Sequence, residues 1–257
     1  MAHALGFPEV EHEQLPSAPL RAMLGQIQFA PLPRIADMAG IAPFQEAIAA
    51  SFPDFSPEQQ MSVVLGPDGA MQSGTTQNWR FSTTDRAWSV VLNPGALTLE
   101  AAASQYTSYA AFRERFHEVW EVALTQLRPT RRLQIGLRYI DHIEAEGPST
   151  AWSDWVKREV LGIEARPELA ARLQQSLSDH RLNIDGAVLA FKHGIVQTGP
   201  GLKWGYLLDF DYFRQEQSDA LATDDVLQQF DVFHDEIYAF FRWCLTDHAL
   251  EVFRRAG

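Results

Sequence analysis

Cysteine is almost absent from this chain of 257 residues, because Cys244 is the only one. A disulfide within the chain is therefore excluded, and so is a structural zinc site built from several cysteines. No stretch approaches the roughly 20 apolar residues that a membrane-spanning helix needs. The first residues lack a basic region followed by a long apolar one, so we expect no secretory signal and a cytoplasmic protein.

Basic residues are also few for the size of the chain. Lys and Arg number 21 against 33 Asp and Glu, which gives a net charge of -12. Sequence-independent binding to nucleic acids needs clustered positive charge, so we expect no nucleic-acid partner in spite of the local Arg128, Arg131 and Arg132 group. The 46% hydrophobic content suffices for one large domain or two small halves.

The hydrophobic pattern of residues 21–127 predicts a strand, a short helix, an antiparallel meander and a long helix, in that order. Residues 21–30 alternate weakly and predict a strand, and Pro43 fits the first turn of a short helix that follows. Short alternating runs fill residues 59–102, with a turn signal at Pro67-Asp68-Gly69, and predict an antiparallel meander. Apolar residues at three- and four-residue steps then predict a long helix over 109–127.

The middle of the chain is less regular. Alternation over residues 133–143 predicts a strand. Thr150 is a candidate N-cap of a short helix, and Pro167 opens another that carries Leu169, Leu173 and Leu177. We expect residues 147–185 to be a junction or an insertion.

The last third predicts a second piece of sheet and a final helix. Asp185-Gly186 marks its start, and residues 188–195 and 203–212 flank Gly199-Pro200-Gly201 as a long hairpin. Apolar residues over 226–245 form one broad helical face that should cover a sheet.

The order of these elements predicts an α+β fold. Strands and helices do not alternate strictly, so a doubly wound parallel sheet is not expected. We predict a mostly antiparallel sheet packed by two long amphipathic helices. Residues 1–20 should form an extended arm, followed by a single domain over 21–257 whose possible related halves are 21–130 and 131–257.

One segment resembles a known family. The run Gln134-Ile135-Gly136-Leu137-Arg138-Tyr139-Ile140-Asp141 is similar to the Arg-Ile-Gly-Leu-Arg-Tyr-apolar-Asn pattern of a family of bacterial conserved hypothetical proteins of similar length, distributed sporadically among genomes. Trp79-Arg80-Phe81-Ser82 and Tyr106 add weaker likeness. Gln134 and Asp141 depart from the pattern. The resemblance implies a bacterial source and one architecture, and it implies no activity, cofactor or catalytic residue.

Four charged residues are the first candidates for a site. Arg138 lies within an apolar strand and must reach a carboxylate, a carbonyl, solvent or an anionic ligand. Asp209 and Asp211 share one face of their strand, and Asp141 on another strand could complete a cluster that holds a ligand or divalent metal. The alternatives are an internal ion pair for Arg138 and a solvated strand face for the two aspartates.

Other residues point more weakly to function. The eight histidines do not converge by spacing, and Cys244 falls on an apolar helix face. We therefore expect no metal site, no cofactor and no catalytic residue. Trp152, Trp155 and Trp204 lie in or near the junction, where they could contact a partner or pack a second core.

Two functions follow from these observations. The first is a non-catalytic protein-interaction or regulatory component of a bacterial system, which binds a protein partner or itself. The alternative is a small-ligand or metal-binding enzyme that uses the Arg and Asp cluster in a cleft between the two halves.

Overall fold

A computed structural model gives the fold of the chain and describes residues 4–7, 10–65, 71–102, 108–145, 147, 150–198 and 203–255. The predicted turns at residues 67–69 and 199–201, and Tyr106, lie outside these described residues.

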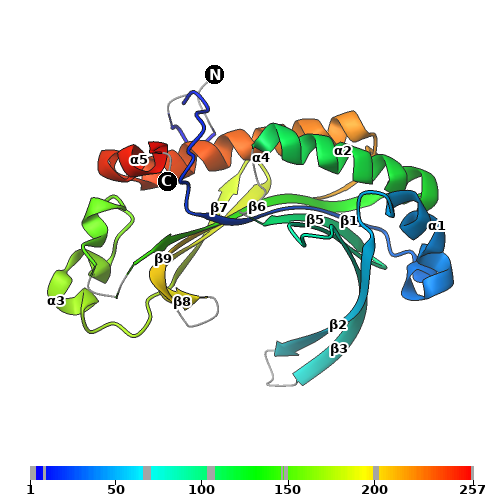
Figure 1. The fold of residues 1–257 in the computed structure, drawn as a ribbon, viewed down its shortest axis with the longest axis horizontal. Coiled ribbons are helices and arrows are strands. Elements are labelled where there is room, and N and C mark those ends of the chain that lie inside the picture. The colour runs from blue at the N-terminus through cyan, green and yellow to red at the C-terminus, as the bar shows by residue number, and fades with distance from the viewer. Residues whose placement is uncertain are drawn as a thin grey trace. The chain divides into compact units, whose positions relative to one another are not determined.

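The fold is α+β with a large antiparallel sheet, as the order of the elements predicts (Figure 1). The strands are β1 Leu20–Phe29, β2 Asp54–Leu65, β3 Met71–Ser82, β4 Trp88–Asn93, β5 Ala96–Ala102, β6 Arg132–Glu144, β7 Ser178–Ile184, β8 Ala187–Thr198 and β9 Lys203–Ser218. The helices are η1 Pro33–Ala36, α1 Met38–Ile48, α2 Tyr109–Gln126, η3 Trp152–Asp154, η4 Ile163–Ala165, α3 Pro167–Ala170, α4 Thr223–Cys244 and α5 Asp247–Arg254. Within the described part of the chain, the strand order is β2-β3-β4-β5-β1-β6-β9-β8-β7, so β2 and β7 are the edges.

Two compact units divide the chain, and each is built from separated segments. Unit 1 comprises Met1–Met23, Gly136–Arg214 and Phe230–Gly257, and unit 2 comprises Leu24–Ile135 and Gln215–Gln229. The predictions of a single domain and of contiguous halves at 21–130 and 131–257 stay predictions.

Unit 2 packs α2 against its strands through the predicted apolar stripe. Ser108 caps the helix by accepting a hydrogen bond from the backbone N–H of Ala111 at 3.2 Å. Phe112 and Phe116 are fully buried and lie against Gly25 of β1, where an added Cβ would come within 3.0 Å of the Phe112 ring. Glycine at this position therefore lets the helix approach the strand closely.

The start of α1 differs from the prediction. Asp37 accepts a hydrogen bond from the Gly40 N–H at 2.8 Å and caps the helix, which then begins at Met38. Pro43 consequently lies inside the helix and not in its first turn. The few residues between Met38 and Pro43 are too short a stretch to show helical periodicity, so the sequence did not predict that the helix begins at Met38.

Unit 1 contains a strand that the sequence pattern did not predict. β7 pairs with β8, and the pair closes at Ile184 and Ala187 around Asp185-Gly186. Both turn residues have positive φ, 50° for Asp185 and 82° for Gly186, as a tight hairpin turn requires. The predicted hairpin is therefore a three-stranded meander, and Asp185-Gly186 lies inside it. β7 is an edge strand, and most of its residues are polar and exposed. Its sequence therefore lacks the clear apolar and polar alternation that would have predicted a strand.

The two short helices predicted after residue 150 are shorter than expected. Thr150 donates to the Gly147 carbonyl at 2.9 Å and does not cap η3. α3 ends at Ala170, so Leu173 and Leu177 lie beyond it. The final helix predicted over residues 226–245 corresponds to α4, and a separate α5 that was not predicted follows it. Thr246 caps α5 by accepting from the Ala249 N–H at 3.2 Å.

Candidate functional site

The predicted Arg138 and Asp209 form a direct ion pair in unit 1. Arg138 Nε and Nη2 each donate to one oxygen of Asp209 at 2.7 Å, so the contact is bidentate. The Asp209 side chain is only 8% exposed, whereas that of Arg138 is 38% exposed. The hydrogen bonds to Asp209 raise the pKa of Arg138, although burial opposes them. Arg138 thus has an internal carboxylate partner.

The other two aspartates have different surroundings. Burial raises the pKa of Asp211 above its ordinary value, and Arg138 partly offsets this effect. Asp141 is three positions from Arg138 along β6 and therefore faces the other side of the strand. Burial, and secondarily the negative charge of Asp209, raise the pKa of Asp141 to about 8. Asp141 is therefore mainly protonated at neutral pH and is a poor partner for a cation.

The three tryptophans do not share one surface. Trp152 is fully buried, with its ring 5.4 Å from that of Tyr206, so it contributes to the core of unit 1. Trp155 is half-buried and meets the ring of His248 edge-on at 5.7 Å. Trp204 is half-buried on β9. Partner binding by these residues stays a prediction.

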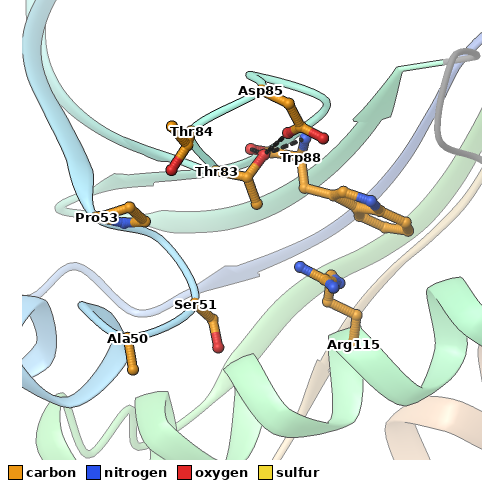
Figure 2. Close-up of a pocket in the computed structure, with 8 residues that line it drawn as sticks. All are labelled: Ala50, Ser51, Pro53, Thr83, Thr84, Asp85, Trp88 and Arg115. Carbon is orange, nitrogen blue, oxygen red and sulfur yellow. Dashed lines mark hydrogen bonds between the residues drawn. The ribbon is translucent and has the colours of Figure 1, made fainter.

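A shallow cavity of about 400 Å³ lies in unit 2 between the end of α1, the turn before β4 and helix α2 (Figure 2). Its lining is Ala50, Ser51, Pro53, Thr83, Thr84, Asp85, Trp88 and Arg115. Figure 2 shows the Arg115 guanidinium reaching from α2 toward the Trp88 ring. The guanidinium carbon lies 4.8 Å from the centre of that ring and 5.8 Å from the centre of the Phe52 ring.

Arg115 is chemically distinctive in this cavity. Among the described residues, no carboxylate lies within ion-pair distance of its guanidinium. The nearby Asp85 carboxylate already accepts from Thr83 Oγ1 at 2.5 Å and from the Ala87 N–H at 3.0 Å. These hydrogen bonds lower the pKa of Asp85. The cavity therefore combines an aromatic-stacked cation with the hydroxyl-bearing side chains Ser51 and Thr84, a suitable set for a small anion.

Sequence spacing missed a cluster of two histidines and an aspartate in unit 1. One ligand atom each from His12, His234 and Asp235 lies within 4.8 Å of the others. His12 Nε2 is 3.1 Å from Asp235 Oδ1, and His234 Nδ1 shares a hydrogen bond with the Tyr139 hydroxyl at 2.8 Å. Burial, assisted by nearby His12, lowers the pKa of His234 to about 3. The sequence shows only that His234 and Asp235 are neighbours. His12 comes from the N-terminal arm, far away in the chain, so spacing could not place it beside them.

A closed loop in unit 1 carries three exposed apolar side chains, and we call residues 163–177 the apolar loop. Ile163, Leu169 and Leu177 are 54%, 46% and 47% exposed. Glu164 accepts from Ser176 Oγ near the two ends of the loop, and the Ser176 N–H donates to the Ile195 carbonyl of β8 at 3.0 Å. These hydrogen bonds join Glu164 to Ser176 and tie Ser176 to β8, so they anchor both ends of the loop.

Comparisons with known proteins do not assign the chain to a family. No protein-family model matches it, and no curated protein is significantly similar in sequence. None of the helices in the described ranges combines the length and apolar character needed to cross a membrane.

Proposed function

We propose that this protein is a non-catalytic interaction component of a bacterial cytoplasmic system and that the apolar loop is its contact surface. The observation that supports the proposal is that three of the five large apolar side chains exposed in the described part of the chain, Ile163, Leu169 and Leu177, fall within this one anchored loop. Single exposed apolar residues are ordinary on protein surfaces, but a group of them marks a contact site. The loop precedes β7, which is an edge of the sheet.

The charge of the loop suggests the chemistry of its partner. Its exposed charged residues are Arg166, Glu168 and Arg172, whereas the whole chain carries a net charge of -12. A loop that carries apolar side chains and a small excess of positive charge suits a protein with an apolar groove bordered by acids. Two copies of the chain repel one another through their net charge, so the proposed partner is a different protein.

Leu169→Asp should weaken this binding at least about 10-fold, because a charge would enter an apolar contact. The partner would be identified by a photo-crosslinking residue at position 169 in the native host and then titrated against the purified chain by calorimetry. Val232→Asp is the matched control, since Val232 on α4 is 49% exposed and lies outside the loop. Equal affinities for the two variants, or a dimer of the purified chain that Leu169→Asp dissociates, would contradict the proposal.

A second candidate function is recognition of a small anion in the Arg115 cavity. The Arg115 cavity is a better candidate for a small-ligand site than Arg138. Arg138 already donates from Nε and Nη2 to the two carboxylate oxygens of Asp209. The Arg115 guanidinium lies over the Trp88 ring and lines the same cavity as the hydroxyl-bearing Ser51 and Thr84. A carboxylate or phosphate would bind the guanidinium directly, whereas Asp85 acts on it only through its charge.

Titration with inorganic phosphate and with benzoate, followed by amide chemical shifts, tests this second candidate. We expect shifts around Trp88 and Arg115, and loss of binding by at least about 10-fold in Arg115→Met, which keeps the apolar stem of the side chain. Arg113→Met on the same helix is the control. Saturation by neither anion at millimolar concentration, or unchanged binding in Arg115→Met, would exclude the cavity as an anion site.

A further inference from the structure

We propose that His12, His234 and Asp235 form a binding site for a transition-metal dication, with Zn²⁺ as the reference ion, which fastens the N-terminal arm to helix α4. The site is independent of the proposed contact loop. It would bring together a residue near the start of the chain and two adjacent residues of α4, all within unit 1.

The distances between the ligand atoms are close to those a metal needs. An ion bound tetrahedrally at about 2.0–2.1 Å from nitrogen and oxygen ligands separates those ligands by about 3.3 Å. His12 Nε2 and Asp235 Oδ1 are already 3.1 Å apart, and the atom from His234 is within 4.8 Å of both. The ring centres of His12 and His234 lie 4.7 Å apart, and movement of the exposed His12 and Asp235 side chains would bring the three ligand atoms to the spacing of a bound ion.

The surroundings of His234 fit a metal ligand. Metal-bound histidines commonly use one ring nitrogen for the ion and the other for a hydrogen bond that fixes the ring. The Tyr139 hydroxyl of β6 makes such a hydrogen bond to Nδ1 at 2.8 Å. Tyr139 is therefore assigned as a positioning residue that orients the imidazole.

The arm is held at this place by other contacts as well. The His12 ring stacks on Tyr238 with 4.3 Å between centres, and the Glu13 N–H donates to the Tyr238 hydroxyl at 3.1 Å. The Glu13 side chain accepts from Arg254 through two hydrogen bonds of 2.9 Å and also pairs with Arg242. His12 is thus placed beside α4 before any ion binds, which reduces the entropy lost on binding.

The donor set indicates the class of ion. Two imidazoles and one carboxylate suit Zn²⁺, Co²⁺ or Ni²⁺, whereas Mg²⁺ and Ca²⁺ prefer sites made of oxygen ligands. Three protein ligands leave a coordination position for water or for a group from another molecule.

Calorimetric titration of the full, chelator-treated chain with Zn²⁺ tests the site, with Mg²⁺ as the control ion. We expect one Zn²⁺ per chain and no heat with Mg²⁺. Tyr139→Phe should weaken Zn²⁺ binding about 10- to 100-fold through loss of the outer hydrogen bond, and His12→Ala or Asp235→Asn should weaken it further. His117→Ala, a change of an exposed histidine on α2, should leave the affinity unchanged.

A second measurement distinguishes the metal site from a structural contact. Zn²⁺ should slow amide hydrogen exchange in residues 10–17 of the wild type but not of Asp235→Asn, an exposed and nearly isosteric change that preserves folding. Absence of Zn²⁺ binding, or wild-type affinity in both His12→Ala and Asp235→Asn, would show that the three residues only hold the arm through the His12–Asp235 hydrogen bond and would overturn the proposal.

Discussion

Replacing Asp141 with asparagine should stabilise the protein relative to the wild type by an amount that grows as the pH rises from about 4 to about 8. In the folded protein, burial and the nearby Asp209 raise the pKa of Asp141 to about 8, from an ordinary value of 3.8. Between these two values the folded state holds a proton that the unfolded chain has released. The free energy of unfolding therefore falls by about 1.4 kcal/mol for each pH unit in this window.

Asparagine has no proton to lose, so Asp141→Asn removes this loss of stability. The difference in unfolding free energy between variant and wild type should increase by about 4 kcal/mol from pH 5 to pH 8 and become constant above pH 8. Burial also lowers the pKa of His193 to about 4, which makes stability rise toward pH 6.5, but this contribution is common to both proteins and cancels in the difference.

Urea unfolding at pH 5, 6, 7 and 8 measures this difference. Asp225→Asn, the same substitution at an exposed aspartate near the start of α4, is the matched control variant. A constant difference between Asp141→Asn and the wild type across the series would mean that Asp141 is ionised in the folded protein, contrary to its buried position.

Strong periodicity allowed parts of the fold to be predicted from the sequence. The alternation of residues 59–102 and the helical spacing of 109–127 correspond to β2–β5 and α2. The helical spacing arises because α2 buries one stripe of apolar residues, Phe112, Phe116, Val119, Trp120 and Ala123. The start of α1 was missed because it depends on one capping side chain, Asp37, and the short helix α5, which Thr246 caps, was not predicted.

The candidate sites were harder to predict than the fold. Spacing along one strand correctly put Asp209 and Asp211 on a common face, and pairing of Arg138 with an internal acid was one of the alternatives. The grouping of His12 with His234 depends on where the arm docks, and Arg115 meets Trp88 only through packing of α2 on the sheet. Contacts between residues so far apart in the chain leave no periodic trace in a single sequence.

Arg138→Ala should lower the unfolding free energy by about 2–3 kcal/mol. This value lies between the 0–1 kcal/mol of an exposed ion pair and the 3–5 kcal/mol of a fully buried one, because Arg138 is 38% exposed and Asp209 only 8%. The variant would leave the Asp209 carboxylate buried without its bidentate partner. Asp209→Ala should cost less, because the remaining guanidinium can turn toward water.

A double-mutant cycle of these two changes separates an internal ion pair from a ligand-binding arginine. If the pair is structural, Arg138→Ala combined with Asp209→Ala should be milder than the sum of the single changes by about 1–2 kcal/mol. Arg138→Lys is the matched control, since it keeps the charge but loses the bidentate geometry. If Arg138 instead serves an external anion, additive single changes are expected, and Asp209→Ala should tighten phosphate binding by releasing the guanidinium.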